Sequence, residues 1–239
     1  MLLWILIAAM LSLPSAGNRE AATWASRMEA RYRGAKTLQA TFLERYAENG
    51  REVRTESGTA YFRRPGKMRW EYEVPEKNLF LVDGKTAWFY VPGDHTATRV
   101  PAKESRDLRT PLALLAGEMK VSRVCARVES AGAEKPIREG DVVLSCKLRE
   151  PKPAHSGRSS DARAAETSSA NDEVLFEIVR DTGELTRLLV RQNGGIEVEF
   201  RFENWRMDPA VSDTMFRFTP PEGVAIVNGE LPEADAAVR

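Results

Sequence analysis

A long succession of short apolar segments separated by turn residues constrains the fold of this chain more than any other feature. From Arg63 to Tyr90 the chain reads RRPGKMRWEYEVPEKNLFLVDGKTAWFY. Within KMRWEYEV, residues 67–74, apolar and charged side chains take alternate positions, which is typical of a strand with one buried face. Pro65-Gly66 and Asp83-Gly84 lie between such segments, and Asp-Gly is a strong tight-hairpin signal. Short strands at this spacing predict an antiparallel meander.

The same rhythm runs from residue 37 to residue 227, and we count about ten or eleven strands without an internal repeat. Two helical segments interrupt it. Residues 19–33 carry apolar side chains at helical spacing and are followed by Gly34, which predicts an amphipathic helix. Residues 110–118, TPLALLAGE, predict a short helix with Thr110 as the cap and Pro111 in the first turn. We read MKVSRVCARV, residues 119–128, as the next strand.

The N-terminal segment, MLLWILIAAMLSLPSAGN, is interpreted as a targeting signal rather than as part of the fold. Its apolar run is too short to span a bilayer, and small residues follow at a plausible cleavage position between Ala16 and Gly17. We therefore expect residues 1–16 to be a signal peptide, although no basic residue follows Met1. The alternative is an uncleaved or buried N-terminal helix. Since no Cys follows the run, we expect export without a lipid anchor.

The remaining residues are predicted to form one domain, residues 17–228. Within it, residues 151–172 are rich in Ser, Ala and charge and contain no large apolar side chain. Such a segment cannot bury enough surface to offset its ordering entropy, so we expect a flexible loop between two strands. The alternative, a linker between two domains, is weaker because the strand pattern continues after it. Residues 229–239 are expected to be a mobile tail.

The two cysteines lie in consecutive alternating segments, Cys125 in VSRVCARVES and Cys146 in DVVLSCKLRE. If these segments pair as a hairpin, the thiols can face each other across it. Export to an oxidising compartment favours a disulfide, with two buried free thiols as the alternative. The chain contains only two histidines, His95 and His155, and together with the two cysteines they make a poor metal site.

Composition and motifs argue against most other function classes. Lys and Arg number 35, and Asp and Glu also number 35, so no overall field favours nucleic acid or an anionic membrane. The chain contains no Gly-x-Ser-x-Gly elbow, P-loop, Rossmann glycine fingerprint or His-Glu-x-x-His motif. His95 and His155 both lie in loop-like stretches. We therefore expect neither an enzyme nor a protein with a cofactor or a metal.

Three segments together identify a family. Residues 63–100 (RRPGKMRWEYEVPEKNLFLVDGKTAWFYVPGDHTATRV), residues 110–118 (TPLALLAGE) and residues 216–227 (FRFTPPEGVAIV) resemble, in order, the periplasmic lipoprotein carrier LolA. The resemblance implies an open, incomplete antiparallel β-barrel of about eleven strands, a mainly β fold of the α+β class. An N-terminal helix and short lid helices would cover its concave apolar side. The long loop at residues 151–172 and the cysteine pair depart from the family's pattern.

What the family does implies a function and a set of partners. Its members take acylated lipoproteins from the inner-membrane transporter LolCDE and carry them through the periplasm to the outer-membrane receptor LolB. We therefore expect a periplasmic carrier, monomeric, that binds no nucleic acid and breaks no bonds. Burial of acyl chains is strongly favourable, so transfer through water requires an apolar cavity with a cover.

The site residues follow from the strand alternation together with this resemblance. Met68, Trp70, Tyr72 and Val74 share one face of residues 67–74, and we assign that face to the cavity. For residues 86–91, both faces are apolar, so the inward face is undecided. The predicted cavity residues are Trp24, Met28, Met68, Trp70, Tyr72, Val74, Leu112 and Leu115. In the family, the arginine before the proline of the Arg-Pro motif holds the lid. The corresponding residue here is Arg64, whose five donors can bind several carbonyls of residues 111–118.

Three other readings stay open. A LolB-type receptor shares the fold but needs a lipobox cysteine, which this sequence lacks. A regulatory half-barrel of the RseB type would bind lipid or a misfolded protein and would carry extra domains. A LolA-like carrier of another lipid is harder to exclude, because an apolar groove does not specify its cargo.

Overall fold

The protein is described by a computed structural model over residues 16–102, 113–117, 120–149 and 173–229. Within these ranges it forms one sheet in the order β12-β6-β5-β4-β3-β2-β1-β11-β10-β9-β8-β7. The strands are β1 (Thr37–Glu48), β2 (Arg51–Arg63), β3 (Lys67–Val74), β4 (Leu79–Val82), β5 (Thr86–Val91), β6 (Thr96–Pro101), β7 (Cys125–Ser130), β8 (Val142–Leu148), β9 (Glu173–Ile178), β10 (Leu185–Gln192), β11 (Ile196–Met207) and β12 (Ala225–Asn228). The helical elements are α1 (Ala16–Arg33), η1 (Pro92–Asp94), α2 (Ala113–Ala116), α3 (Val121–Val124) and η3 (Asp213–Phe216).

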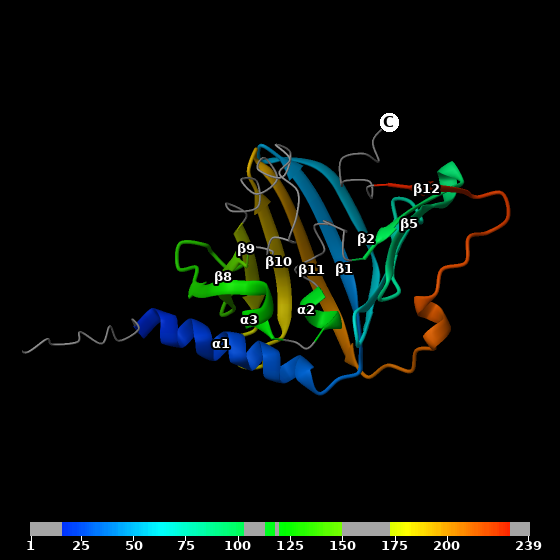
Figure 1. Cartoon of the computed structure of the whole chain (residues 1–239). Helices are drawn as coiled ribbons and strands as arrows, with labels where there is room; N and C mark the ends of the chain where they lie inside the picture. The colour runs from blue at the N-terminus through cyan, green and yellow to red at the C-terminus, as the bar shows by residue number, and fades with distance from the viewer. Residues whose placement is uncertain (1–15, 103–112, 118–119, 150–172, 230–239) are drawn as a thin grey trace, which may run out of the picture.

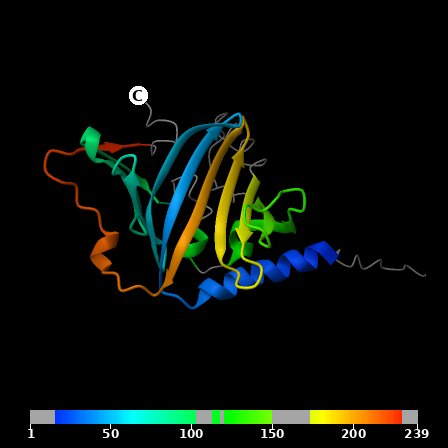
Figure 2. The same ribbon diagram turned by 180° about the vertical axis from the view of Figure 1, so that it is seen from behind.

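The sheet curls without closing, with β12 and β7 as its two edges. Helices α2 and α3 lie against its concave side, and α1 runs across one end of the strands (Figure 1). From behind, the strands stand in front of α2, whereas α1 passes below their ends (Figure 2). The predicted mainly β, open half-barrel with covering helices is confirmed.

The strand at the C-terminal end differs from the antiparallel expectation. The described residues form twelve strands, close to the expected number, and the last, β12, pairs parallel with β6. After β11 the chain crosses the outside of the sheet and reaches the far edge in the direction of β6 (Figure 2). All four residues of β12 are exposed, so its sequence shows no alternation that could have revealed the pairing.

The N-terminal helix is confirmed and is longer than expected, because it begins at Ala16 instead of residue 19. Its buried face is made of Ala21, Ala25, Met28 and Tyr32, which recur at helical spacing. The helix lies directly against the turn after β9. A Cβ atom on Gly183 would come within 2.7 Å of the Arg27 carbonyl carbon, so only glycine fits this contact.

The expected strand at residues 119–128 is wrong in its first half. Residues Val121–Val124 form the short helix α3, and the strand begins only at Cys125. Val121 is buried against the main core, and its backbone N–H donates to the Glu29 carboxylate of α1 at 2.6 Å. This tertiary contact overrides the local β propensity of the Val-rich segment.

The C-terminal segment explains why both faces of residues 86–91 are apolar. Phe89 packs against the main core on the concave side, whereas Trp88 and Tyr90 pack against Phe218 on the convex side. The segment between β11 and β12 therefore covers this part of the outer surface, and η3 lies against β3. Since both faces of β5 have an apolar partner, its side chains need not alternate in polarity.

Several sequence predictions lie wholly or largely outside the described residues. These are the signal peptide at residues 1–16, of which only Ala16 is described, the loop at 151–172, most of the tail at 229–239, and Thr110, Pro111 and Leu112. Among the helices that are described, none is both long and apolar enough to cross a membrane.

Candidate functional site

The strand register arranges the concave face in rungs across β3, β2 and β1. The first rung joins Met68, Phe62 and Leu38, and the second joins Trp70, Ala60 and Ala40. All six side chains are buried, with exposed fractions no higher than 6%. Two small alanines beside Trp70 leave room for its indole ring. The part of the concave face that these two rungs form near α1 is therefore apolar.

Trp70 is the centre of an aromatic cluster on this face. Its ring centroid lies 4.7 Å from Phe42, 5.8 Å from Phe62, 5.4 Å from Phe200 and 6.1 Å from Phe202. The planes are steeply inclined, which is a favourable geometry for aromatic pairs. These rings come from β1, β2 and β11, so the sheet's curl brings together side chains that are far apart in the sequence. The sequence analysis identified Trp70 but not its partners on β11.

Val74 does not belong to the cavity, contrary to the prediction. It is 58% exposed, whereas Met68, Trp70 and Tyr72 are buried. A bulge interrupts the pairing of β2 and β3 between Ser57 and Gly58, so the alternation of β3 ends at Tyr72. At this bulge the strands approach so closely that a Cβ atom on Gly58 would lie 1.9 Å from a carbonyl oxygen of β3.

The other predicted cavity residues fall into three positions. Met28 is fully buried on the core side of α1, and Leu115 is 1% exposed in α2. Trp24 is only half-buried; it packs against the core while the Arg180 guanidinium lies 5.4 Å from its ring centroid. Leu112 lies outside the described residues. Trp24 therefore lies at the margin of the site rather than inside it.

Helices α2 and α3 cover the concave face, and we call them the lid. Leu114, Leu115, Ala116 and Val121 of the lid are all buried within the same apolar cluster as Trp70. Each fully buried Leu side chain contributes about 1.5–3 kcal/mol. In this closed arrangement, the lid's own apolar side chains occupy the side of the sheet that an apolar ligand would otherwise contact.

Arg64 connects the lid to the end of α1. Its Nε donates to the Leu115 carbonyl oxygen at 3.3 Å, and its Nη1 donates to the carbonyl oxygens of Arg33 at 2.9 Å and Ala35 at 2.6 Å. The backbone N–H of Gly66 donates to the Ala116 carbonyl oxygen at 2.7 Å. The carbonyls at the end of a helix lack partners within the helix, so a cation is favourable there. We call this set of bonds the latch.

The latch is partly buried, which affects the arginine itself. Burial lowers the pKa of Arg64, and the charge of Asp208 opposes that shift. The Nη2 atom of Arg64 is buried and has no hydrogen-bond partner in the described part of the chain. A buried donor without a partner carries a desolvation cost, which offsets part of what the other bonds of Arg64 contribute to the closed arrangement.

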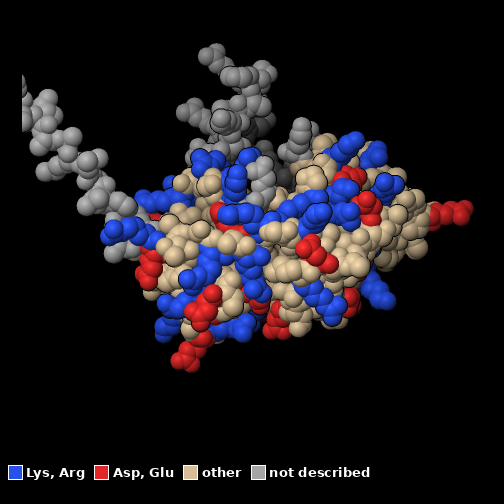
Figure 3. Space-filling model, turned by 90° about the horizontal axis from the view of Figure 1, so that it is seen from below, with Lys and Arg blue, Asp and Glu red and all other residues tan. Residues whose placement is uncertain are grey.

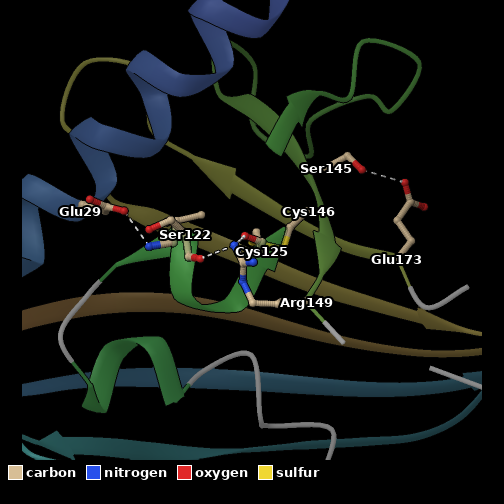
Figure 4. The surroundings of a disulfide bond; sticks show 8 residues. Glu29, Ser122, Cys125, Ser145, Cys146, Arg149 and Glu173 are labelled. Atoms are coloured by element: carbon tan, nitrogen blue, oxygen red, sulfur yellow. Dashed lines mark hydrogen bonds between the residues drawn. A yellow bond between two sulfur atoms is a disulfide. The ribbon is translucent and has the colours of Figure 1, made fainter. Parts of the chain in front are cut away.

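The other end of the lid is anchored covalently. Cys125 and Cys146 form a disulfide between β7 and β8, with Cα atoms 5.4 Å apart (Figure 4). The two residues are not directly opposite: Cys146 pairs with Val128, and a bulge beside Cys125 shifts the register. Cys125 directly follows the last residue of α3, so the disulfide joins the end of the lid to the sheet.

Polar contacts support the same anchor. Arg149 Nη2 donates to the carbonyl oxygens of Ser122 at 2.9 Å and Cys125 at 3.3 Å, and Glu29 accepts from the Val121 N–H (Figure 4). Helix α3 is thus held to α1 on one side and to β8 on the other. The lid is therefore held by the disulfide at one end and by hydrogen bonds to Arg64 at the other.

Sequence reasoning missed a polar group on the concave face. Glu44 is 2% exposed, and its Oε2 accepts a hydrogen bond from the Tyr72 hydroxyl at 2.6 Å. The signal was present, since Glu44 falls on the inward positions of β1 with Phe42 and Tyr46. Whereas Glu44 is a buried charge on the concave face, the outer surface seen from the side of α1 carries Lys and Arg intermixed with Asp and Glu (Figure 3).

The described fold and site define a class: an open half-barrel whose concave apolar face is closed by a separately attached lid. A family model described as "Outer membrane lipoprotein carrier protein LolA" matches residues 33–135. Residues 33–135 are therefore similar to the LolA family, and curated relatives that carry the description outer-membrane lipoprotein carrier protein extend the likeness.

Two relatives extend the likeness beyond the matched range. The outer-membrane lipoprotein carrier protein of Nitrosomonas europaea is 29% identical, over 81% of this chain and 83% of that protein. The carrier protein of Chromobacterium violaceum is 28% identical over 94% of each chain. An uncharacterised conserved protein of Thermus thermophilus superposes with a TM-score of 0.50 at 12% identity, covering 87% of this chain and 99% of that one, which shows the fold alone.

Proposed function

We propose that this protein is a periplasmic carrier of lipoproteins, which binds their acyl chains on its concave face and shields them from water in transit. The observation that carries the proposal is the combination of a buried aromatic face with a lid that Arg64 holds by hydrogen bonds. A permanent core would not need a separately attached cover. The names of the relatives support the same assignment.

The energetics require such a cover. Burial of an acyl chain contributes about 0.8 kcal/mol per methylene, so a chain of about fifteen methylenes gains roughly 12 kcal/mol. Spontaneous release into water is correspondingly slow, and delivery must go directly from one apolar site to another. The carrier must therefore open its lid for each partner and close it between them.

The partners in this proposal are those of the family. Cargo would come from an inner-membrane transporter of the LolCDE type and go to an outer-membrane receptor of the LolB type. The protein would act as a monomer and carry out no covalent reaction. Its cargo would be acylated lipoproteins, with other lipids as the competing possibility.

Mass spectrometry of the protein purified from the periplasm tests the proposal. We expect N-terminally acylated lipoproteins to co-purify with the wild-type chain in a complex that survives gel filtration. The experiment is done with lipoprotein release from the inner membrane active and again with it blocked. Recovery of phospholipid without lipoprotein under both conditions would contradict the lipoprotein assignment and favour a carrier of another lipid.

A further inference from the structure

The concave face changes from apolar to polar along the strands. Beyond the rungs of Met68 and Trp70, the next rung contains Tyr72, and the one after it pairs Glu44 with Glu56. Glu44 is 2% exposed and Glu56 is 7% exposed. A face that bound only hydrocarbon would gain nothing from carboxylates at these positions.

These polar groups are held in defined positions. The Tyr72 hydroxyl donates to Glu44, and Arg54 Nε lies 3.1 Å from an oxygen of Glu56. Burying a carboxylate is costly unless hydrogen bonds or an opposite charge compensate for it. The fold supplies that compensation for both carboxylates, through Tyr72 and Arg54. A buried carboxylate beside an aromatic cluster is suited to a ligand that is apolar over most of its length and has a hydrogen-bond donor at one end.

A second, independent observation lies on the neighbouring rung. The indole N–H of Trp70 is fully buried and has no acceptor within the described ranges. A buried donor without an acceptor is destabilising, so a ligand that supplies an acceptor there gains affinity. Trp70 and Tyr72 are two residues apart on the same face of β3, about 7 Å along the strand. The unused donor and the Tyr72–Glu44 pair therefore border the same part of the face.

We propose that Trp70, Tyr72 and Glu44 form a binding site for the polar junction of the cargo, where the acyl chains join the N-terminal cysteine. The Trp70 N–H donates to an ester carbonyl oxygen of an acyl chain. Glu44, oriented by the Tyr72 hydroxyl, accepts from the nitrogen of the acylated cysteine. The acyl tails lie over the apolar rungs of Trp70 and Met68. This inference rests on the proposed carrier function and specifies which group of the cargo is recognised.

The two halves of the site predict different preferences. An ether-linked chain has the same length and apolar surface as an ester-linked chain but no carbonyl acceptor. Loss of one neutral hydrogen bond weakens binding by about fivefold. A free cysteine amine is charged and forms a stronger, charge-assisted bond to Glu44 than an acetylated amine does. The wild-type protein should therefore prefer an ester over an ether and a free amine over an amide.

Three synthetic peptides test the site, with the full disulfide-bonded chain and dissociation constants from calorimetry. All share one sequence; the first carries a dipalmitoyl-glyceryl cysteine, the second its dialkyl ether analogue, and the third the ester with an acetylated amine. Trp70→Phe should abolish the ester preference, so that the ester and ether peptides bind with equal affinity. Glu44→Gln should abolish the amine preference alone. Trp88→Phe, on the convex face, is the matched control and should change neither.

The outcomes separate this inference from the proposed function. If wild-type protein binds all three peptides equally well, the polar site is refuted while the carrier function stands. If the wild-type protein binds none of the three acylated peptides more tightly than it binds the same peptide without lipid, the polar site and the carrier function are both refuted. Circular dichroism and thermal melting verify that each variant folds. Should a variant fail to fold, the comparison of the three peptides on the wild-type chain still decides the question.

Discussion

Replacing Arg64 by Leu should make cargo harder to release while leaving it easy to load. In the closed state, Arg64 holds the lid through Leu115 and holds the end of α1 through Arg33 and Ala35. Cargo must displace the lid, so every bond that opposes opening lowers cargo affinity and assists later release. Leucine keeps much of the apolar stem and removes all three bonds.

The size of the effect depends on which of the three Arg64 bonds joins the lid and which join the end of α1. Of the three bonds that Arg64 makes, only the bond to Leu115, at 3.3 Å, must break when the lid moves, and the bond from Gly66 to Ala116 is present in the variant as well. A long charge-assisted bond contributes about 1.5 kcal/mol, which corresponds to roughly tenfold in an equilibrium constant. The variant should therefore bind acylated cargo up to about tenfold more tightly. The bonds to Arg33 and Ala35 hold the end of α1, and their loss should lower the free energy of unfolding by about 3 kcal/mol.

A reconstituted transfer assay measures the expected change directly. Purified carrier loaded with a labelled lipoprotein is mixed with excess receptor, and the transfer rate is recorded. We expect about tenfold slower transfer for Arg64→Leu. Arg63→Leu is the matched control, because Arg63 points to the other side and binds Asp213 and the Val211 carbonyl. Wild-type rates for a folded Arg64→Leu protein, or equal slowing in the control, would refute the latch.

Three further predictions concern the rest of the site. Removing the disulfide with the pair Cys125→Ala and Cys146→Ala should lower the free energy of unfolding in urea by about 3 kcal/mol, the loop-closure value for a separation of 21 residues; an unchanged midpoint would show that it contributes nothing. Binding of a fatty-acyl probe should shift tryptophan emission in the wild-type protein but not in Trp70→Phe, and an equal shift in both would place the ligand elsewhere. Gly58→Ala should destabilise the fold by about 1–3 kcal/mol in thermal or urea denaturation, since its Cβ meets backbone, whereas Gly93→Ala, where no atom lies within 4 Å, should be neutral.

The sheet was predictable from sequence because alternation and turn residues are local signals. Residues 67–72 alternate as expected, and the helix ending at Arg33 carries its apolar face at the predicted spacing. What failed depends on distant contacts. The end of alternation at Val74 depends on a bulge in the pairing of β3 with β2, between the pairs Tyr72–Gly58 and Val74–Ser57. Helix α3 forms where Glu29, far away in the sequence, accepts from the Val121 N–H.

The site shows the same division. Arg64 could be assigned because the family resemblance pointed to it, yet the carbonyl acceptors on Arg33 and Ala35 have no side-chain signature at all. A backbone oxygen becomes an acceptor through the place where a helix ends, which sequence fixes only to within a residue or two. Glu44 was visible in the alternation of β1, but its significance depends on Tyr72, two strands away, which donates to it.

The closed lid is held less firmly than the same fold could hold it, and this fits a carrier. Apolar burial of Leu114 and Leu115 favours the closed state when no cargo is present, but an acyl chain can replace those contacts with equivalent ones. The apolar terms therefore nearly cancel when cargo enters, and the balance falls to the few hydrogen bonds made by Arg64 and Gly66. The unused Nη2 donor of Arg64 keeps that polar contribution small. The covalent anchor at Cys125 meanwhile fixes one end of the lid, so that opening exposes the face without releasing the cover.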